Sequence, residues 1–237
     1  MNTRTADDGV AEVIGFLLII AVIVAFAGVW ILIYLPSEGN MVETDHARLV
    51  TEQFADLKYG IDLLWITGRE GVTSSRLISP SPVEGTTISG LLFLSPPVGT
   101  GTITLGKGTN FKINNNLVTA LKITYNSANY YASDIRLVYD GGAIFRNDEG
   151  EAQSVFLDPS LGTDRLVLVT VNNDNEQQVL GNIPLSVTYS YVDTIYYDNA
   201  DVTLVSADSD NPWHDFLPQT FANVTVVEYE ASIGGWS

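Results

Sequence analysis

The chain contains no cysteine and only two histidines, His46 and His214, in 237 residues. Without thiols it can form neither a disulfide nor a cysteine-ligated zinc site, and a histidine-dependent catalytic triad has almost nothing to use. We therefore expect no cofactor and no enzymatic activity. Carboxylates on neighbouring strands could still meet as a hydrolytic pair, but no pair stands out in the sequence. His46 lies between acids on an expected helix, which predicts a solvated side chain.

Basic residues are also scarce. The 11 Lys and Arg residues are set against 28 Asp and Glu residues, which gives a formal net charge of -17 and a pI of about 4.2. An acidic surface of this kind repels nucleic acid and anionic lipid, so no nucleic-acid partner is expected. The same surface suits high salt, where screening weakens its self-repulsion.

The chain does contain one long apolar run, from Gly9 to Leu35. After Glu12 no charged residue occurs before Glu38. A helix that rises about 1.5 Å per residue would carry this run across a hydrocarbon core of roughly 30 Å. The run is longer than the core of a secretory signal peptide, which has only about 7–15 apolar residues. We predict a single membrane-spanning helix over residues 10–36.

Charges on the two sides of this run differ. Arg4 precedes it, whereas Glu38, Glu43 and Asp45 follow it before the first basic residue, Arg48. Basic residues favour the cytoplasmic side of a membrane. The asymmetry predicts a single-pass protein with its bulk outside the cell.

The start of the run carries a family resemblance. The sequence Gly9-Val10-Ala11-Glu12-Val13-Ile14-Gly15-Phe16, followed by an unbroken apolar helix, resembles the N-terminus of archaeal type IV pilins and pilin-like proteins. The resemblance implies a class III signal peptide, residues 1–9, that a prepilin peptidase removes between Gly9 and Val10. It also implies that the helix moves from the membrane into the core of a filament of pilin subunits. Asp8 departs from the family, which usually has Lys or Arg at that position.

Glu12 has two interpretations. A carboxylate at the edge of an apolar span is costly to bury unless a cation meets it. After cleavage, the new amino group of Val10 in the same or a neighbouring subunit could supply that cation during assembly. In the other interpretation Glu12 lies in the headgroup region of a permanent anchor, near the positive end of the helix.

Residues 37–70 are expected to form a kink followed by an amphipathic helix. Pro36-Ser37-Glu38-Gly39-Asn40 combines a proline and a glycine, which predicts a kink or a short unwound segment. Apolar residues then recur at helical spacing from about Thr44 to Thr67, and Gly68 follows as a stop signal. We expect the apolar stripe of this helix to pack on the domain that follows.

From Leu77 onward the apolar period changes to two, which indicates strands, and residues 71–237 are expected to form an extracellular β domain. Turn-rich segments such as Asp140-Gly141-Gly142 separate them. The pattern predicts an α+β protein in which a long hydrophobic helix precedes an antiparallel β domain, either a sandwich or a barrel, with the sandwich as our prediction. Arg165–Val171 and Gln178–Tyr191 are expected to form a hairpin. The strands are expected at Thr86–Phe93, Thr100–Leu105, Ala120–Tyr125, Ile135–Tyr139, Ala143–Arg146, Ser154–Leu157, Arg165–Val171, Gln178–Tyr191, Val202–Val205 and Phe221–Glu230.

Other candidate sites in this domain are weaker. Asp208, Asp210 and Asp215 surround Trp213 in the richest polar cluster and could bind Ca²⁺, although the spacing is not that of an EF-hand. Asn223 begins the one glycosylation sequon, Asn-Val-Thr. Gly106-Lys107-Gly108 is expected to be a hairpin turn. The tyrosines at positions 189, 191, 196 and 197 could stack on sugars, but packing in a strand is the simpler expectation.

These observations leave two function hypotheses and a remote third. The first is a structural subunit of a pilus-like surface filament, whose partners would be other pilin subunits, the prepilin peptidase and the membrane. The alternative is a permanently anchored extracellular β-sandwich protein that binds a glycan, the cell envelope or an archaellum-associated partner. A membrane-tethered hydrolase is the third, for which no nucleophile or metal set is visible.

Overall fold

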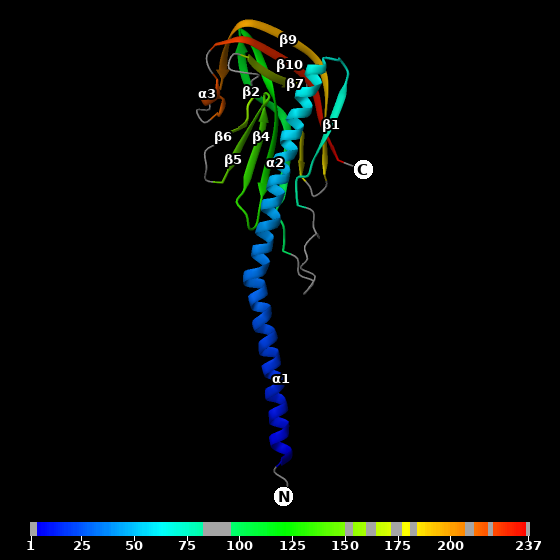
Figure 1. The fold of residues 1–237 in the computed structure, drawn as a ribbon, viewed down its shortest axis with the longest axis vertical. Coiled ribbons are helices and arrows are strands. Elements are labelled where there is room, and N and C mark those ends of the chain that lie inside the picture. The colour runs from blue at the N-terminus through cyan, green and yellow to red at the C-terminus, as the bar shows by residue number, and fades with distance from the viewer. Residues whose placement is uncertain are drawn as a thin grey trace.

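The computed structural model describes residues 4–82, 96–149, 154–159, 165–171, 177–180, 184–206, 211–217 and 220–235. Figure 1 shows a long helical rod with a β domain wrapped beside its upper half. The rod consists of α1 (Arg4–Val29), a single π-helical turn (Trp30–Tyr34) and α2 (Leu35–Thr67). The expected plan, a long apolar helix and then a strand-rich α+β domain, is confirmed. The predicted strand Thr86–Phe93 lies outside the described residues.

The sequence predicts a kink or a short unwound segment at Pro36–Asn40. This prediction is wrong, because the helix continues through these residues. The backbone N–H of Leu35 instead reaches back five residues to the carbonyl of Trp30, which makes a π-helical turn immediately before the proline. Proline has no N–H to donate and its ring crowds the preceding turn of an α-helix. One wider turn accommodates both defects without ending the helix. The rings of Trp30 and Tyr34 stack within this turn, with centroids 4.0 Å apart.

α2 ends where the sequence predicts. Gly68 adopts a left-handed conformation with φ of +58°, and its N–H donates to the carbonyl of Leu64 at 3.1 Å. This φ is readily adopted by glycine, which has no Cβ. The chain then turns back into β1 (Thr73–Ile78), which lies along the sheet.

The remaining strands form one sheet. Its path runs β6-β5-β4-β3-β7-β10-β9-β2-β8, with β1 paired to β9. The bounds are β2 (Thr100–Ile113), β3 (Asn116–Ala128), β4 (Ile135–Asp140), β5 (Ala143–Asp148), β6 (Ser154–Leu157), β7 (Arg165–Val171), β8 (Gln177–Leu180), β9 (Leu185–Val205) and β10 (Thr220–Gly235), with a short helix α3 (Trp213–Phe216) before β10.

The sheet closes on itself and is not purely antiparallel. β3, β7, β10, β9 and β2 pair in a circuit, and β3 pairs back to β2. β7 and β10 run parallel, with Val224 opposite Leu166 and Val227 opposite Val169. The prediction of an antiparallel sandwich is therefore corrected to a mixed sheet with a five-stranded closed core. The circuit is weakest between β3 and β7, which share the single pair Ala120 and Thr170.

The expected hairpin of Arg165–Val171 with Gln178–Tyr191 is wrong. β7 pairs with β10 and β3, and the second segment divides into β8, which pairs with β2, and β9, which pairs with β1, β10 and β2. β9 also continues through to Val205, so the separately predicted strand Val202–Val205 is its end. The true tight hairpins turn at Asn114-Asn115 and Gly141-Gly142, where positive φ angles allow a two-residue connection.

Gly106-Lys107-Gly108 lies inside β2 and is not a hairpin turn. The register with β3 shifts between Lys107 and Asn110, where β2 holds one extra residue. A bulge of this kind reverses which side chains face each side of the strand. Accordingly Ile103 and Leu105 belong to one hydrophobic core, whereas Phe111 and Ile113 belong to another.

The two cores lie on opposite faces of the central strands. In β7, Val167 and Val169 join the core under α2, while Leu166 and Leu168 join the core around Trp213. Both faces of β7 are therefore buried, which explains why its sequence is a continuous apolar run and does not alternate. The core under α2 is the one that fixes the helix to the β domain.

Candidate assembly helix and its anchor in the β domain

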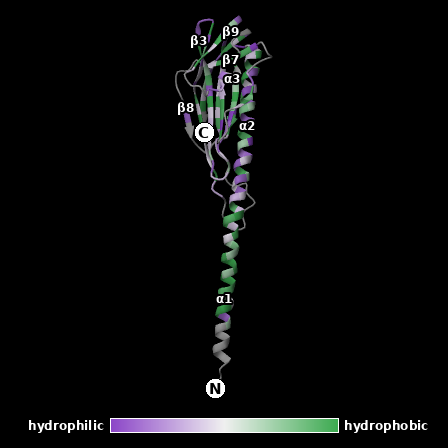
Figure 2. Cartoon of the chain, turned by 90° about the vertical axis from the view of Figure 1, so that its left-hand side faces the viewer, coloured by the Kyte–Doolittle hydropathy of each residue, from purple (hydrophilic) through white to green (hydrophobic). Residues whose placement is uncertain are grey.

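From Val13 to Val29 every residue of α1 is apolar, and the large side chains of this segment are exposed. Their exposed fractions run from 40% at Ile20 to 63% at Phe16. Figure 2 shows hydrophobic residues around the lower rod and mixed colouring along α2. Among the described residues this is the one helix long and apolar enough to cross a membrane. Burying a large apolar side chain is worth roughly 1.5–3 kcal/mol, so this helix needs an apolar environment outside its own chain.

The residues predicted for processing and assembly lie at the start of this helix. Gly9 and Val10 belong to the first turns of α1, and Glu12 follows with an exposed side chain. They are neighbours in sequence, and the N-terminal end of the rod, where α1 begins, lies away from the β domain (Figure 1). Cleavage between Gly9 and Val10 and the pairing of Glu12 stay predictions.

Glu43 is the main polar anchor between the helix and the β domain. Its side chain is 1% exposed. Oε1 accepts the backbone N–H groups of Gly99 and Tyr130, each at 2.9 Å, and Oε2 accepts those of Tyr131 and Ala132, each at 2.8 Å. Hydrogen bonds to an ionised acceptor are stronger than neutral ones. One carboxylate thus holds two loops of the β domain against the helix.

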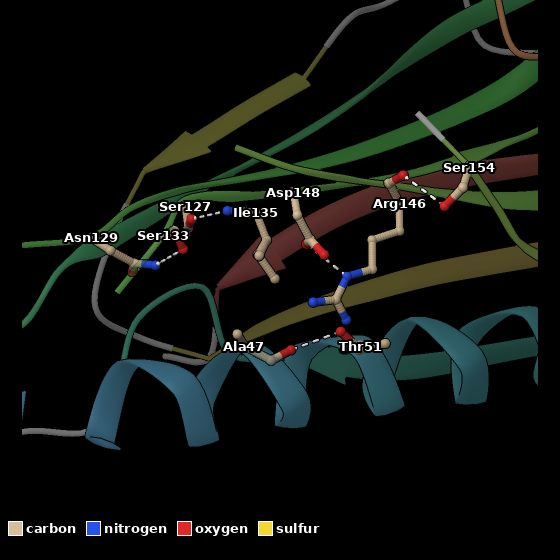
Figure 3. Close-up of polar contacts among 9 residues, drawn as sticks. All are labelled: Ala47, Thr51, Ser127, Asn129, Ser133, Ile135, Arg146, Asp148 and Ser154. Carbon is tan, nitrogen blue, oxygen red and sulfur yellow. Dashed lines mark hydrogen bonds and ion pairs between the residues drawn. The ribbon is translucent and has the colours of Figure 1, made fainter. Parts of the chain in front are cut away.

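The loop that receives Glu43 is held in shape by its own side chains. It connects β3 to β4 over residues 129–134. Asp134 Oδ1 accepts the N–H of Asn129 at 2.7 Å, and Asn129 Nδ2 donates to the carbonyl of Ser133 at 2.9 Å. Ser127 Oγ accepts the N–H of Ile135 at 2.7 Å. Figure 3 shows the last two of these bonds above α2. These bonds hold the loop in a shape in which the N–H groups of Tyr130, Tyr131 and Ala132 point toward the Glu43 carboxylate.

Three further contacts extend the anchor along α2. Asn40 Nδ2 donates to the carbonyl of Tyr131 at 3.0 Å. His46 Nε2 lies 3.0 Å from the carbonyl oxygen of Ser79, and Gln53 Oε1 accepts the N–H of Ser79 at 2.9 Å. These contacts bridge residues distant in the sequence, so they fix both the position and the rotation of the helix.

His46 is buried, which corrects its predicted solvated position. Its side chain is 8% exposed, and its ring centroid lies 6.5 Å from that of Tyr125. Burial lowers the pKa of His46 below 6.5, because it disfavours the charged imidazolium, while the hydrogen bond to the Ser79 carbonyl opposes the change. A neutral imidazole that donates Nε2–H to the Ser79 carbonyl is compatible with both the burial and the hydrogen bond.

Two glycines let α2 approach the sheet closely. A Cβ at Gly39 would collide with the ring of Tyr131, and a Cβ at Gly60 would collide with the hydroxyl of Tyr189. Neither glycine is needed for a positive φ, since both are helical. Their role is therefore to leave room for aromatic side chains of the β domain.

A second buried carboxylate organises the core around Trp213. Asp140 Oδ1 accepts the N–H of Thr109 at 3.1 Å, and Oδ2 accepts its hydroxyl at 2.6 Å. Asn211 Nδ2 donates to the same hydroxyl at 3.3 Å, which ties the segment before α3 to the sheet. Burial raises the pKa of Asp140, and the bonds from Thr109 together with Lys122 oppose that rise. Trp213 itself packs edge-on against Phe111 and Phe145.

The proposed calcium site falls outside the part of the chain that the structure describes. Asp208 and Asp210 are among the residues not described, as is the side chain of Asp215. Within the described residues no group of three acidic or histidine side chains could hold a metal ion.

Asn223 lies in β10 between β7 and β9, opposite Arg165 and Asp198, with a half-buried side chain. Its glycosylation stays a prediction.

The four tyrosines of β9 do not form one surface. Tyr189 is fully buried in the core under α2, where its ring meets that of Tyr229 edge-on. Tyr191 and Tyr197 pack at the edges of the two different cores, whereas Tyr196 is 70% exposed. Packing in the strand therefore accounts for most of them.

Glu43 and Asp140 were not singled out from the sequence. Glu43 had a visible signal, because it continues the buried stripe of α2 with helical spacing, before His46, Val50 and Phe54. A carboxylate on an otherwise buried stripe indicates a specific partner. Asp140 had no such signal, since its partner Thr109 lies on a different strand.

No protein-family model, no curated protein and no solved structure matches this chain.

Proposed function

We propose that the chain is a structural subunit, major or minor, of an archaeal type IV pilus-like surface filament. Residues 1–9 are the leader, and the prepilin peptidase removes them before Val10. The apolar helix resides in the membrane and then passes into the filament core, where other pilin subunits surround it. The acidic β domain faces the medium.

The observation that carries this proposal is the apolar segment Val13–Val29 of α1, whose large side chains are exposed. Lipid tails and other copies of the same helix are both apolar surroundings. Transfer from one to the other therefore costs little apolar free energy. A helix that only anchored a protein would also be apolar, so the additional support comes from Gly9, Val10 and Glu12 at its start.

The anchor supports the proposal mechanically. A subunit drawn from a membrane by contacts on its β domain must transmit the force to its helix. The continuous helix through Pro36 and the four hydrogen bonds of Glu43 provide such a connection. A flexible linker between anchor and domain would not.

The test is the N-terminal residue of the native protein, determined by mass spectrometry separately for membrane and sheared surface fractions. We expect Val10 as the first residue in a sedimenting filament fraction. Glu12→Ala is expected to leave cleavage intact and reduce the filament fraction at least about tenfold, whereas the exposed acid variant Glu70→Ala, in the turn after α2, assembles normally.

An intact Met1 leader on protein that stays in the membrane would contradict the proposal. Protein of this kind that also retained a glycan or envelope ligand would favour the alternative, a permanently anchored extracellular binding protein.

A further inference from the structure

The rod sets the height of the β domain above a membrane that holds α1. The uncharged segment Val13–Ile33 is roughly 30 Å long at about 1.5 Å per residue, which matches the hydrocarbon core of a bilayer. Trp30 and Tyr34 stack at its C-terminal end, and both residue types are enriched where a membrane meets water. The outer boundary of the hydrocarbon then falls near Ile33.

Of the contacts described above between α2 and the β domain, those of the loop between β3 and β4 lie nearest this boundary. Asn40 Nδ2 donates to the carbonyl of Tyr131 at 3.0 Å, and the Tyr131 ring occupies the space that a Cβ at Gly39 would need. Glu43 holds the same loop one turn further along the helix. These bonds fix the loop at one level of the rod.

That level is the one at which lipid headgroups meet water. Gly39 is six residues beyond Ile33, which is roughly 9 Å along the helix. The headgroup layer of each leaflet is roughly 5–8 Å thick, since a bilayer measures about 40–45 Å with its headgroups and about 30 Å without them. A tilt of about 20°, the average for membrane helices, lowers the loop further when the rod leans toward the β domain.

Tyr130 is exposed on this loop. Its exposed fraction is 69%, whereas its backbone N–H is held by Glu43 at 2.9 Å. The loop is therefore fixed to the helix while the ring of Tyr130 stays free to contact another surface. A tyrosine ring is apolar and its hydroxyl is polar, which suits the layer between hydrocarbon and water.

We propose that Tyr130 and its loop rest on the headgroup layer of the outer leaflet while α1 resides in the membrane. Figure 2 shows the β domain on one side of α2, so this contact also sets the direction in which the rod tilts. The inference rests on one part of the proposed function, the residence of α1 in a membrane, and is independent of the filament.

Charge favours a contact through a neutral aromatic ring with neutral lipid. A chain with a net charge of -17 is repelled by anionic lipid. Asp134 is exposed at this loop, but its carboxylate accepts the N–H of Asn129 and the hydroxyl of Ser127 within the chain. We therefore expect the contact with zwitterionic phosphatidylcholine and a weaker contact as anionic lipid is added.

The first experiment uses the absence of cysteine, because a single introduced cysteine then carries a single fluorescent probe. Labelled full-length Tyr130→Cys and Tyr59→Cys are each placed, one chain per disc, in phosphatidylcholine nanodiscs that contain a lipid with a nitroxide on its headgroup. Tyr59 is the matched control, 66% exposed on α2 and 26 residues beyond Ile33, roughly 39 Å along the helix. We expect quenching at position 130 to be at least about threefold stronger than at position 59, because only the loop reaches the headgroups. Equal quenching would overturn the inference.

The second experiment keeps Tyr130 and moves the probe to Ser133→Cys, an exposed position on the same loop. Quenching at position 133 is compared with and without the change Tyr130→Ser, and Tyr59→Ser is the control. We expect Tyr130→Ser to reduce the quenching at least about twofold, because the aromatic ring holds the loop against the headgroups, and Tyr59→Ser to leave it unchanged. Circular dichroism confirms folding. Unchanged quenching in Tyr130→Ser would show that Tyr130 does not make the contact.

The outcomes separate the two proposals. Strong quenching at position 130 in a protein that keeps its leader and never assembles would retain the lipid contact and reject the filament function. Filaments that begin at Val10, together with equal quenching at positions 130 and 59 in nanodiscs, would retain the function and overturn the lipid contact. A probe at position 130 that is unquenched in nanodiscs and is protected from a soluble quencher only in filaments would assign Tyr130 to a contact between copies instead.

Discussion

A single carboxylate, that of Glu43, carries four hydrogen bonds between the helix and the β domain. The stabilisation that this carboxylate provides depends on its burial, because its removal would take the acceptor away from four backbone N–H groups. Leaving a buried donor unsatisfied costs about 1–3 kcal/mol, more than the net gain from an ordinary hydrogen bond. Glu43 is therefore a structural residue whose charge serves the backbone of the β domain.

Replacement of Glu43 by Ala is expected to lower the free energy of unfolding of the β domain by about 3 kcal/mol or more. Glu43→Gln should cost less, because one amide oxygen still accepts two N–H groups while the amide nitrogen faces the other two. Urea unfolding of the full-length chain in detergent, followed by tryptophan fluorescence, measures both. Glu52→Ala, exposed on the same helix, is the control and should change little. Equal effects at the two positions would contradict the role of Glu43.

His46 makes stability depend on pH. Its pKa is lowered from 6.5 in the folded state by burial, so below pH 6.5 the unfolded chain binds a proton more readily than the folded chain. The contribution of His46 to stability is therefore complete above pH 6.5 and is lost as the pH falls below that value. Asp140 has the opposite sign, since burial raises its pKa and its contribution weakens as pH rises above 3.8.

The prediction for His46 is tested as a difference between proteins that both retain Asp140. We expect the free energy of unfolding of the native chain to fall relative to that of His46→Gln between pH 7.5 and pH 5, because glutamine keeps a donor near the Ser79 carbonyl without titrating. Urea titrations at several pH values give the difference. A difference that stays constant with pH would show that His46 does not carry this dependence.

At the scale of elements, α2 packs closely against the sheet along one face. Its buried residues recur at helical spacing, and two glycines admit aromatic groups that a larger residue would exclude. Helix propensity alone would favour alanine over glycine by about 1 kcal/mol. The presence of glycine within this helix is thus explained by the close approach of helix and sheet.

Gly60→Ala is expected to destabilise the β domain by about 1–3 kcal/mol despite the better helix propensity, because the new methyl group collides with the Tyr189 hydroxyl and lies 3.1 Å from Arg76. The double variant Gly60→Ala with Tyr189→Phe should recover most of the loss. Gly28→Ala, which meets nothing within 4 Å in this chain, is the control. Thermal unfolding of all three variants in detergent gives the comparison, and a stabilised Gly60→Ala protein would contradict the close-contact explanation.

At the scale of the whole molecule, two apolar systems remain separate. The β domain buries its cores around α2 and around Trp213, whereas α1 keeps its apolar surface exposed. The separation leaves the helix available to lipid or to other copies without unfolding the domain. The two parts are joined by the helix that continues through the π-helical turn and by the hydrogen bonds of Glu43.

The sequence by itself determined those features that depend on neighbouring residues. The apolar run, the period of α2, the stop at Gly68, the turn at Gly141-Gly142 and the positions of most short strands follow from local spacing and from glycine geometry. Glu12 and the Gly9–Val10 step are also local patterns, and their roles in processing and assembly stay predictions. Glu43 also occupies a position of the buried stripe of α2, and the helical spacing of that stripe is visible in the sequence.

Only the tertiary structure decided which strands pair, because pairing partners lie far apart in the chain and apolar alternation does not identify them. It set β7 parallel to β10, divided Gln178–Tyr191 between two strands and buried His46 against Ser79. It also supplied the partners of Glu43 from two loops distant in sequence. These contacts arise because the two hydrophobic cores bury apolar residues from segments far apart in the chain, and local spacing does not record which segments meet.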